Sequence, residues 1–256
     1  MSGVGSVGGY SSYSPYSVVS SGGAITAASQ DASGLAIAEK TEAQTRALDQ
    51  GAENLKDGKS ALNIEDGAME GITDYLQQIK ELAVKAKNDL MTEEDRGYIQ
   101  QQISQYMQGI NDLANSTSFN EKKLLDGSSE DLTVVADGNG STAKVSAYNS
   151  TVESLGIADF DVTSGNFNLD DIDKAMEKVQ SSRANVGAET NRIDYAVGYN
   201  SKASMELNGF QMDKAEDRSI EALQDIKKKQ ALDQYQMMLQ KKQQDDNETR
   251  SQMFFA

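Results

Sequence analysis

Pairs of adjacent acidic residues come nearest to acid–base or cation-binding chemistry in this sequence: Glu93-Glu94, Asp170-Asp171 and Asp245-Asp246. Two convergent carboxylates could hold a cation or transfer a proton. These pairs, however, fall at expected helix starts or in polar runs, and neighbouring residues on a helix do not face each other. We therefore assign no catalytic and no metal-binding residue.

Residue types missing from the sequence exclude further chemistry. The chain has no Cys, no His and no Trp among its 256 residues. It therefore lacks a thiol nucleophile, a thiolate metal site, a disulfide and an imidazole base. No Gly-rich loop follows a strand to open a helix, as a phosphate-binding site requires. The sequence predicts neither an enzyme nor a bound cofactor.

Charge and hydropathy argue against two kinds of partner. The net charge of −16 and the pI near 4.4 oppose nucleic-acid binding, which needs clustered Lys and Arg. No apolar stretch reaches the roughly 18 residues that span a bilayer, and the first thirty residues lack the basic start and apolar core of a secretory signal. We expect no nucleic acid, no membrane insertion, and export without a cleavable signal.

The first half of the chain is predicted to be a head followed by helices. Residues 1–24 are dominated by Gly, Ser, Tyr and Val, and this composition predicts disorder in isolation because few bulky aliphatics offset the ordering entropy. Residues 25–125 contain helix formers with periodic apolar positions. Several consecutive helices are expected there, with interruptions at Gly58, Gly67, Gly71 and Asn88-Asp89.

Two apolar stripes define the helices of this half. The first has spacings of three and four residues that place its members on one helical face: Met69, Ile72, Leu76, Ile79, Leu82, Ala83 and Ala86. Thr92, followed by three acidic residues, predicts the N-cap of the next helix. The stripe of that helix comprises Ile99, Ile103, Tyr106, Ile110 and Leu113.

Residues 126–168 predict a small β region between helical halves. The runs Leu132–Ala136 and Lys144–Ala147 contain β-branched residues, and the segment 137–140, Asp-Gly-Asn-Gly, supplies glycines where a turn needs positive φ. We expect an antiparallel hairpin here.

The second half contains a heptad pattern. Positions four and three residues apart form a seam interrupted by polar side chains: Ile172, Met176, Val179, Arg183, Val186, Thr190, Ile193, Val197, Asn200, Ser204 and Leu207. This predicts one long helix over residues 169–212, followed by a second amphipathic helix and a polar tail within residues 213–256. The fold class is mainly α: an elongated rod of long antiparallel helices, like a helical bundle or coiled coil, with a small β-hairpin.

Several motifs resemble those of bacterial flagellins. Residues 32–40 (ASGLAIAEK), the segment from Leu76 to Val84, and the segment from Phe119 to Gly127 are similar to the N-terminal region of that family, over roughly residues 31–128. Residues 172–175 and 179–187, continuing into Asn191-Arg192-Ile193, are similar to its C-terminal region. Both halves occur in the order typical of the family.

The resemblance implies a non-enzymatic structural subunit of the extracellular flagellar filament, which assembles with itself or other flagellin subunits by helix–helix packing. The alternatives are a hook–filament junction protein and a soluble helical adaptor that derives from flagellin and no longer polymerises. Both ends differ from the family pattern, because residues 1–24 replace a long amphipathic helix and Lys241, Lys242, Asp245, Asp246 and Glu248 replace an apolar closing stretch. Whether the chain polymerises alone or only co-assembles stays open.

The resemblance also implies two sets of partner-facing residues. Positions that match those presented to the host innate flagellin receptor are Gln78, Leu82 and Gln102, and two of them are neutral where the family has charges. A weak response of this receptor is therefore expected. The amphipathic helix over residues 220–239 is a candidate docking site for a flagellar export chaperone, through Ile220, Leu223, Leu232, Tyr235 and Leu239.

Overall fold

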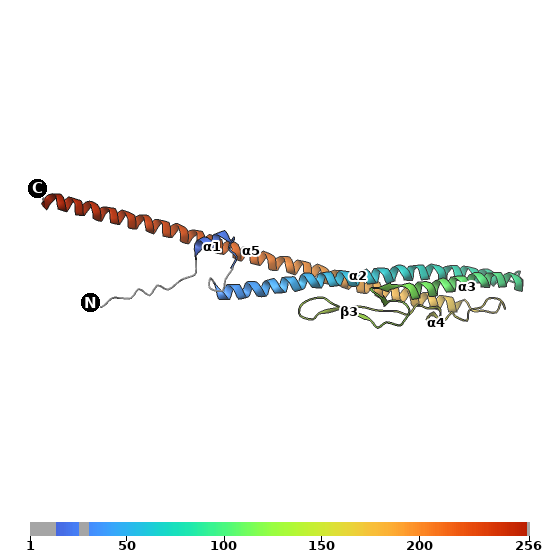
Figure 1. Ribbon diagram of the computed structural model, residues 1–256. Coiled ribbons are helices and arrows are strands. Elements are labelled where there is room, and N and C mark those ends of the chain that lie inside the picture. Colours follow the sequence, from blue (N-terminus) through green and yellow to red (C-terminus); the bar gives the residue numbers. More distant parts are fainter. Residues whose placement is uncertain (1–13, 26–30, 255–256) are drawn as a thin grey trace. The chain divides into compact units, whose positions relative to one another are not determined.

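The computed structural model describes residues 14–25 and 31–254, and side chains as far as residue 247 (Figure 1). In chain order, the elements are α1 (Pro15–Ser20), α2 (Ala32–Ala86), α3 (Glu93–Ser116), β1 (Ser118–Phe119), β2 (Lys122–Lys123), β3 (Leu132–Val135), β4 (Thr142–Val145), α4 (Val152–Leu155) and α5 (Asp170–Phe254). The prediction of a mainly α fold with long helices and a small β-hairpin is confirmed.

The chain divides into two compact units. We call Arg46–Ala203 the central unit. The terminal unit consists of the part up to Thr45 and the part from Ser204 onward. Each is described by itself below.

In the central unit, α2 runs antiparallel to both α3 and α5. Tyr75 of α2 packs against Tyr106 of α3 with ring centroids 5.8 Å apart, and the Arg96 Nε donates to the carbonyl of Ala86, 2.9 Å away, at the end of α2. Ion pairs join α2 to α5 in falling order along α5, first Lys59–Asp194, then Asp66–Arg183 and Lys80–Asp173. This order fixes the antiparallel direction.

The predicted stripes form the core of this unit. Six members of the first stripe are fully buried, and Leu82 packs against them while partly exposed. In α3, Ile99, Ile103 and Ile110 are buried, and Tyr106 and Leu113 lie at the edge of the same cluster. Burial of these faces supplies most of the free energy that holds the long helices together.

The heptad seam of α5 is also confirmed in the central unit. Ile172, Val179, Val186 and Ile193 are buried, and the polar members of the seam in this unit have partners. The Arg183 guanidinium pairs with Asp66 at 2.8 Å, and the Asn200 amide donates to the carbonyl of Ala136 at 2.6 Å. Polar side chains are therefore tolerated in the seam because each meets a specific group.

The predicted N-cap of α3 is a reciprocal capping box. The Thr92 hydroxyl accepts from the Asp95 backbone N–H at 3.1 Å, and the Asp95 carboxylate accepts from the Thr92 N–H at 3.1 Å. The Thr92 hydroxyl also donates to the Asp95 carboxylate at 2.7 Å, and this hydrogen bond, together with that from the Thr92 N–H, holds the pKa of Asp95 below its usual value. Two otherwise unpaired donors at the helix start are thus satisfied.

The predicted hairpin is present as β3 and β4, paired antiparallel from Leu132 opposite Val145 to Val135 opposite Thr142. The Asp137 carboxylate accepts from the backbone N–H groups of Asn139 and Ser141, which stabilises the turn. The sequence analysis did not predict β1 and β2. These strands are joined by a two-residue turn, in which Asn120 and Glu121 have φ of 45° and 67°.

Four predicted helix breaks, three in α2 and one in α5, are absent. α2 continues through Gly58, Gly67 and Gly71, and α5 continues from residue 170 to 254 instead of ending near 212. A glycine inside a helix costs about 1 kcal/mol relative to alanine, which packing of the flanking turns can offset. At Gly71 the missing side chain also leaves room for Leu113, whose Cδ1 would lie 3.0 Å from an added Cβ.

The expectation of disorder over residues 1–24 is wrong for its last part. Helix α1 begins with proline at its first position, where the fixed φ suits a helix start, and Val18 is buried. Residues 1–13 lie outside the described residues. Composition alone missed α1 because its order comes from contacts within the terminal unit.

Candidate functional site

The candidate functional features of the described residues are surfaces. Within residues 14–25 and 31–254, no group of three or more acidic side chains is arranged to hold a metal ion. Nor does any helix in this part of the chain have the length and hydropathy of a membrane span. The acidic pairs Asp170-Asp171 and Glu93-Glu94 lie in the first turns of α5 and α3, where they complement the helix dipole.

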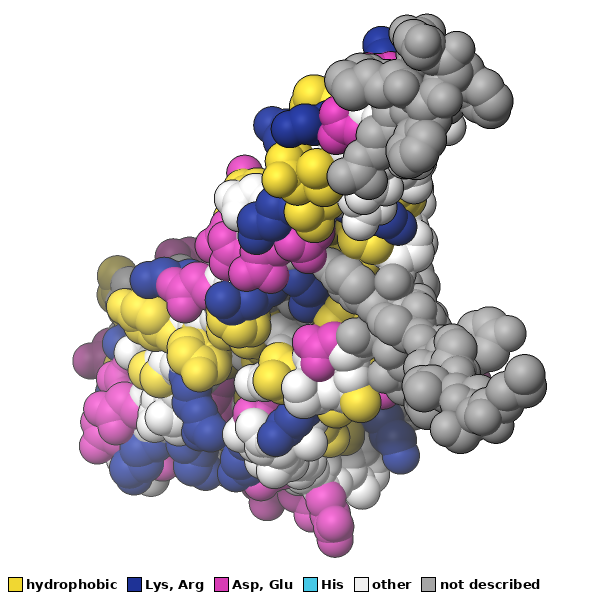
Figure 2. All heavy atoms as spheres, turned by 90° about the vertical axis from the view of Figure 1, so that its left-hand side faces the viewer, with side chains coloured by type: hydrophobic (Ala, Val, Ile, Leu, Met, Phe, Trp, Pro, Cys, Tyr) yellow, Lys and Arg dark blue, Asp and Glu magenta, His cyan; other side chains and the backbone are white. Residues whose placement is uncertain are grey.

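In the terminal unit, α5 exposes many large apolar side chains from Phe210 onward. Its large side chains remain substantially exposed: Phe210, Met212, Ile220, Leu223, Leu232, Tyr235, Met237, Met238 and Leu239. Hydrophobic side chains reach the surface between acidic and basic ones in the space-filling view (Figure 2). Exposed apolar groups in this number on one helix are a candidate interaction surface. We call this set the α5 apolar surface.

The five predicted chaperone-docking residues all belong to this surface. Leu232, Tyr235 and Leu239 follow one another at three and four residues, so they share one helical face. Ile220 and Leu223 lie one helical turn apart nearer the centre of α5, and both are about 45% exposed. The rest of the described chain therefore does not bury these five residues.

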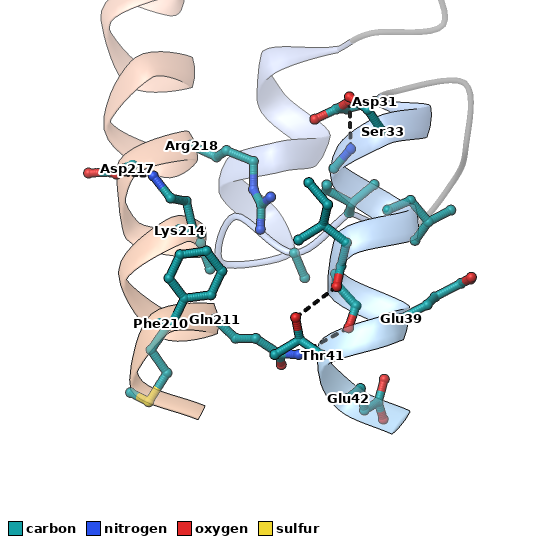
Figure 3. Close-up of a pocket in the computed structure, with 18 of the residues that line it drawn as sticks. Asp31, Ser33, Glu39, Thr41, Glu42, Phe210, Gln211, Lys214, Asp217 and Arg218 are labelled. Atoms are coloured by element: carbon teal, nitrogen blue, oxygen red, sulfur yellow. Dashed lines mark hydrogen bonds and ion pairs between the residues drawn. The ribbon is translucent and has the colours of Figure 1, made fainter. Parts of the chain in front are cut away.

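A groove of about 940 Å³ lies between the start of α2 and α5 within the terminal unit. Phe210, Gln211 and Lys214 line it from α5, and Ile37 and Thr41 line it from α2 (Figure 3). The Gln211 amide crosses the groove and donates to the carbonyl of Ala38 at 3.0 Å. This hydrogen bond to the α2 backbone ties the two helices together in the terminal unit.

The first turn of α2 is fixed by Asp31, which also lines the groove. Its carboxylate accepts from the Gly34 backbone N–H at 2.9 Å and from the Ser33 hydroxyl at 2.9 Å. These two hydrogen bonds keep the pKa of Asp31 below its usual value. Asp31 thereby acts as the N-terminal cap of the helix.

A second contact in the terminal unit joins the turn after α1 to α5. The Arg218 guanidinium extends from α5 and its Nε donates to the carbonyl of Gly23 at 2.8 Å (Figure 3). Gly23 has φ of +81°, and a Cβ added there would lie 1.7 Å from the carbonyl oxygen of Ala215. Only glycine fits this approach. Ala222 is fully buried on the same helix.

The sequence analysis did not single out Gly23, Gln211 or Arg218. The adjacent glycines at 22 and 23 were the available signal, because two glycines after an apolar turn favour a chain reversal with positive φ. Side chains such as Gln211 and Arg218 carry no local signal, since their partners are backbone carbonyls far along the chain.

The three positions matched to the innate-receptor contacts lie on α2 and α3 of the central unit. Gln78 and Gln102 are exposed, and Leu82 is partly buried against the core. The structure thus shows that the two amides are accessible to a partner, while receptor binding itself stays a prediction.

Comparisons with known proteins show which sequences this chain resembles. A family model described as the bacterial flagellin N-terminal helical region matches residues 16–130. A flagellin of Halalkalibacterium halodurans is 31% identical over 197 residues, which cover 74% of this chain and 72% of that protein. The flagellar filament 33 kDa core protein of Treponema phagedenis is 33% identical over 199 residues, 70% of each chain.

Solved structures show the same fold. The crystal structure of Bacillus cereus flagellin has a TM-score of 0.53 and 24% identity, covering 58% of this chain and 88% of that one. A protein of Vibrio parahaemolyticus assigned as a flagellar hook-associated protein has a TM-score of 0.61 and 16% identity, covering 73% of this chain and all of the other. At these identities the likeness concerns the fold alone.

Proposed function

Since this chain belongs to the bacterial flagellin family, we propose that the α5 apolar surface is where it contacts neighbouring subunits in the flagellar filament. The chain is a structural subunit of this extracellular filament, and its partners there are other flagellin subunits. Motility is the process that it serves. We assign it no catalytic role.

The observation that supports the assembly surface is the contrast between burial and hydrophobicity along α5. The same helix buries its apolar side chains at Ile172, Val179, Val186 and Ile193, yet exposes comparable side chains beyond Phe210. A subunit joined to others can bury this surface, and removal of apolar area from water then drives association.

The test adds a charge to this surface and to a matched polar position. Leu232→Asp and Leu239→Asp should abolish pelleting of the protein after seeding with filament fragments, because each places a carboxylate in the contact. Gln244→Asp, whose neighbours three and four residues away on α5 are all polar, should pellet like the parent protein. Equal pelleting of all three variants would exclude the surface from assembly, and circular dichroism would check that each is folded.

We further propose that a flagellar export chaperone covers part of this surface before assembly, through Ile220, Leu223, Leu232, Tyr235 and Leu239. An exposed apolar helix face fits the groove of a helical partner, which would keep subunits apart. Calorimetric titration with the export chaperone of the same cell should show binding to the parent protein and at least tenfold weaker binding to Leu232→Asp. Unchanged affinity would rule out this docking site.

We also propose that the host innate flagellin receptor responds weakly to this protein. Gln78 and Gln102 are accessible but uncharged, so they cannot form charge-assisted hydrogen bonds. A reporter-cell assay should show low potency that Gln78→Arg increases. Full potency of the unmodified protein would contradict the proposal.

A further inference from the structure

Glu65 is an acidic side chain inside the apolar core of the central unit. It lies on α2 between the buried residues Leu62 and Met69, and its own exposed fraction is 0%. Neither carboxyl oxygen has a hydrogen-bond partner within the described part of the chain. An ionised carboxylate in this position would be costly, because nothing replaces the water that it loses.

The charges that act on Glu65 come from each element packed around it. Glu189 of α5, Asp131 just before β3 and its neighbour Asp66 are all acidic. Two of these already have basic partners, since Asp131 pairs with Lys144 of β4 at 2.6 Å and Asp66 pairs with Arg183. The phenol of Tyr148 also senses the Glu65 charge. No cation is left to neutralise Glu65 itself among the groups that these contacts describe.

The acidic neighbours also attach the β3–β4 hairpin. The Glu189 carboxylate accepts from both the backbone N–H and the hydroxyl of Ser146, at 3.0 and 2.5 Å. The Asp131 carboxylate accepts from the backbone N–H of Ala147 at 3.0 Å. On the α2 side, the Asn54 amide donates to the carbonyl of Val135 at 3.1 Å. The hairpin is thus held on α2 and α5 around a buried acid.

We propose that Glu65 is a proton-dependent switch for the packing of the β3–β4 hairpin. When Glu65 is protonated, the hairpin packs on α2 and α5. When Glu65 loses its proton, Glu189 and Asp131 repel the carboxylate, which also requires hydration. The hairpin therefore separates locally from α2 and α5, and water reaches the carboxylate. This property belongs to a single chain and does not depend on filament assembly.

The electrostatics agree with this geometry. Burial is the main cause that raises the pKa of Glu65 to about 8, and the negative charges of Glu189, Asp131 and Asp66 act in the same direction. The folded chain therefore binds a proton that the open form releases between pH 4.5 and 8, and opening becomes more favourable as the pH rises through this window. Above pH 8 the effect levels off.

Hydrogen exchange tests the switch. The protection factors of the β3 and β4 amides, corrected for the intrinsic pH dependence of exchange, should fall about tenfold per pH unit from pH 6 to 8, as release of one proton requires. In Glu65→Gln they should not depend on pH. Glu81→Gln, at an exposed position on the same helix, should behave like the parent. Amides around Ile103 in α3 should stay protected throughout.

A second measurement covers the case in which Glu65→Gln loosens the hairpin at every pH. Carbon-13 NMR of the Glu65 carboxyl in the parent protein should show a titration near pH 8, the pH at which the fall in hairpin protection levels off. A titration near pH 4.5 with the hairpin still protected would overturn the proposal, as would equal pH slopes in the parent and Glu65→Gln.

Discussion

Large apolar side chains are buried in the central unit but exposed in the terminal unit. In the central unit lie all of the largest fully buried side chains, from Leu55 to Ile172. Among the described residues of the terminal unit, the buried hydrophobic side chains are Val18 and Ala222, while Phe210, Met212 and many residues after them are exposed. The difference indicates that the central unit is stable by its own packing, whereas the terminal unit needs neighbouring molecules to bury its apolar groups.

The largest expected effect comes from a core deletion compared with the same change on the α5 apolar surface. Leu62→Ala should lower the free energy of unfolding by about 2–5 kcal/mol, because it leaves a cavity in the central unit. Leu232→Ala should change it by less than about 0.5 kcal/mol, since Leu232 is 60% exposed. Urea unfolding followed by circular dichroism measures both. Equal losses would show that the terminal unit has a core of its own.

A smaller effect is expected at the turn after α1. Gly22→Ala and Gly23→Ala both place alanine at positive φ, at a cost of roughly 1 kcal/mol each. Gly22 faces open space, but a side chain on Gly23 would collide with the backbone of Ala215. Hydrogen exchange should therefore show loss of protection in α1 for Gly23→Ala and much less for Gly22→Ala. Identical exchange in the two variants would contradict the close contact with α5.

The smallest effect is expected for the ion pair in the seam. A double-mutant cycle with Asp66→Asn and Arg183→Met should give a coupling of about 0.5–1 kcal/mol, because the pair is only partly exposed to solvent. The exposed pair Glu53–Lys56 provides the control, and its coupling should lie close to zero. A larger coupling in the control would mean that burial in the seam adds nothing to the pair.

Local sequence signals predicted the elements that local chemistry determines. Thr92 with Asp95 identified the start of α3, the segment 137–140 identified the hairpin turn, and the spacing of Ile172, Val179 and Val186 identified the packed face of α5. In each case the residues that carry the signal also make the contacts.

Features determined by distant contacts were not predictable in this way. Gly58 lies in close contact with the hairpin, since a Cβ there would lie 3.0 Å from a methyl group of Val134, so this glycine marks a tertiary contact and not a helix break. The turn that follows α1 is held by Arg218, far along the chain. The burial of Glu65 had no sequence signal either, because an acidic residue within a helical pattern is ordinarily placed on the solvent face.

Electron microscopy of the purified protein, alone and after addition of fragments of an ordinary filament from the same cell, tests the filament function most directly. We predict that subunits add to the fragments and extend them, because the α5 apolar surface is buried by contact with a neighbour. Growth without fragments would show in addition that the chain nucleates its own filament. Persistent monomers under both conditions, from protein that circular dichroism shows to be helical, would contradict the assignment and favour a soluble adaptor.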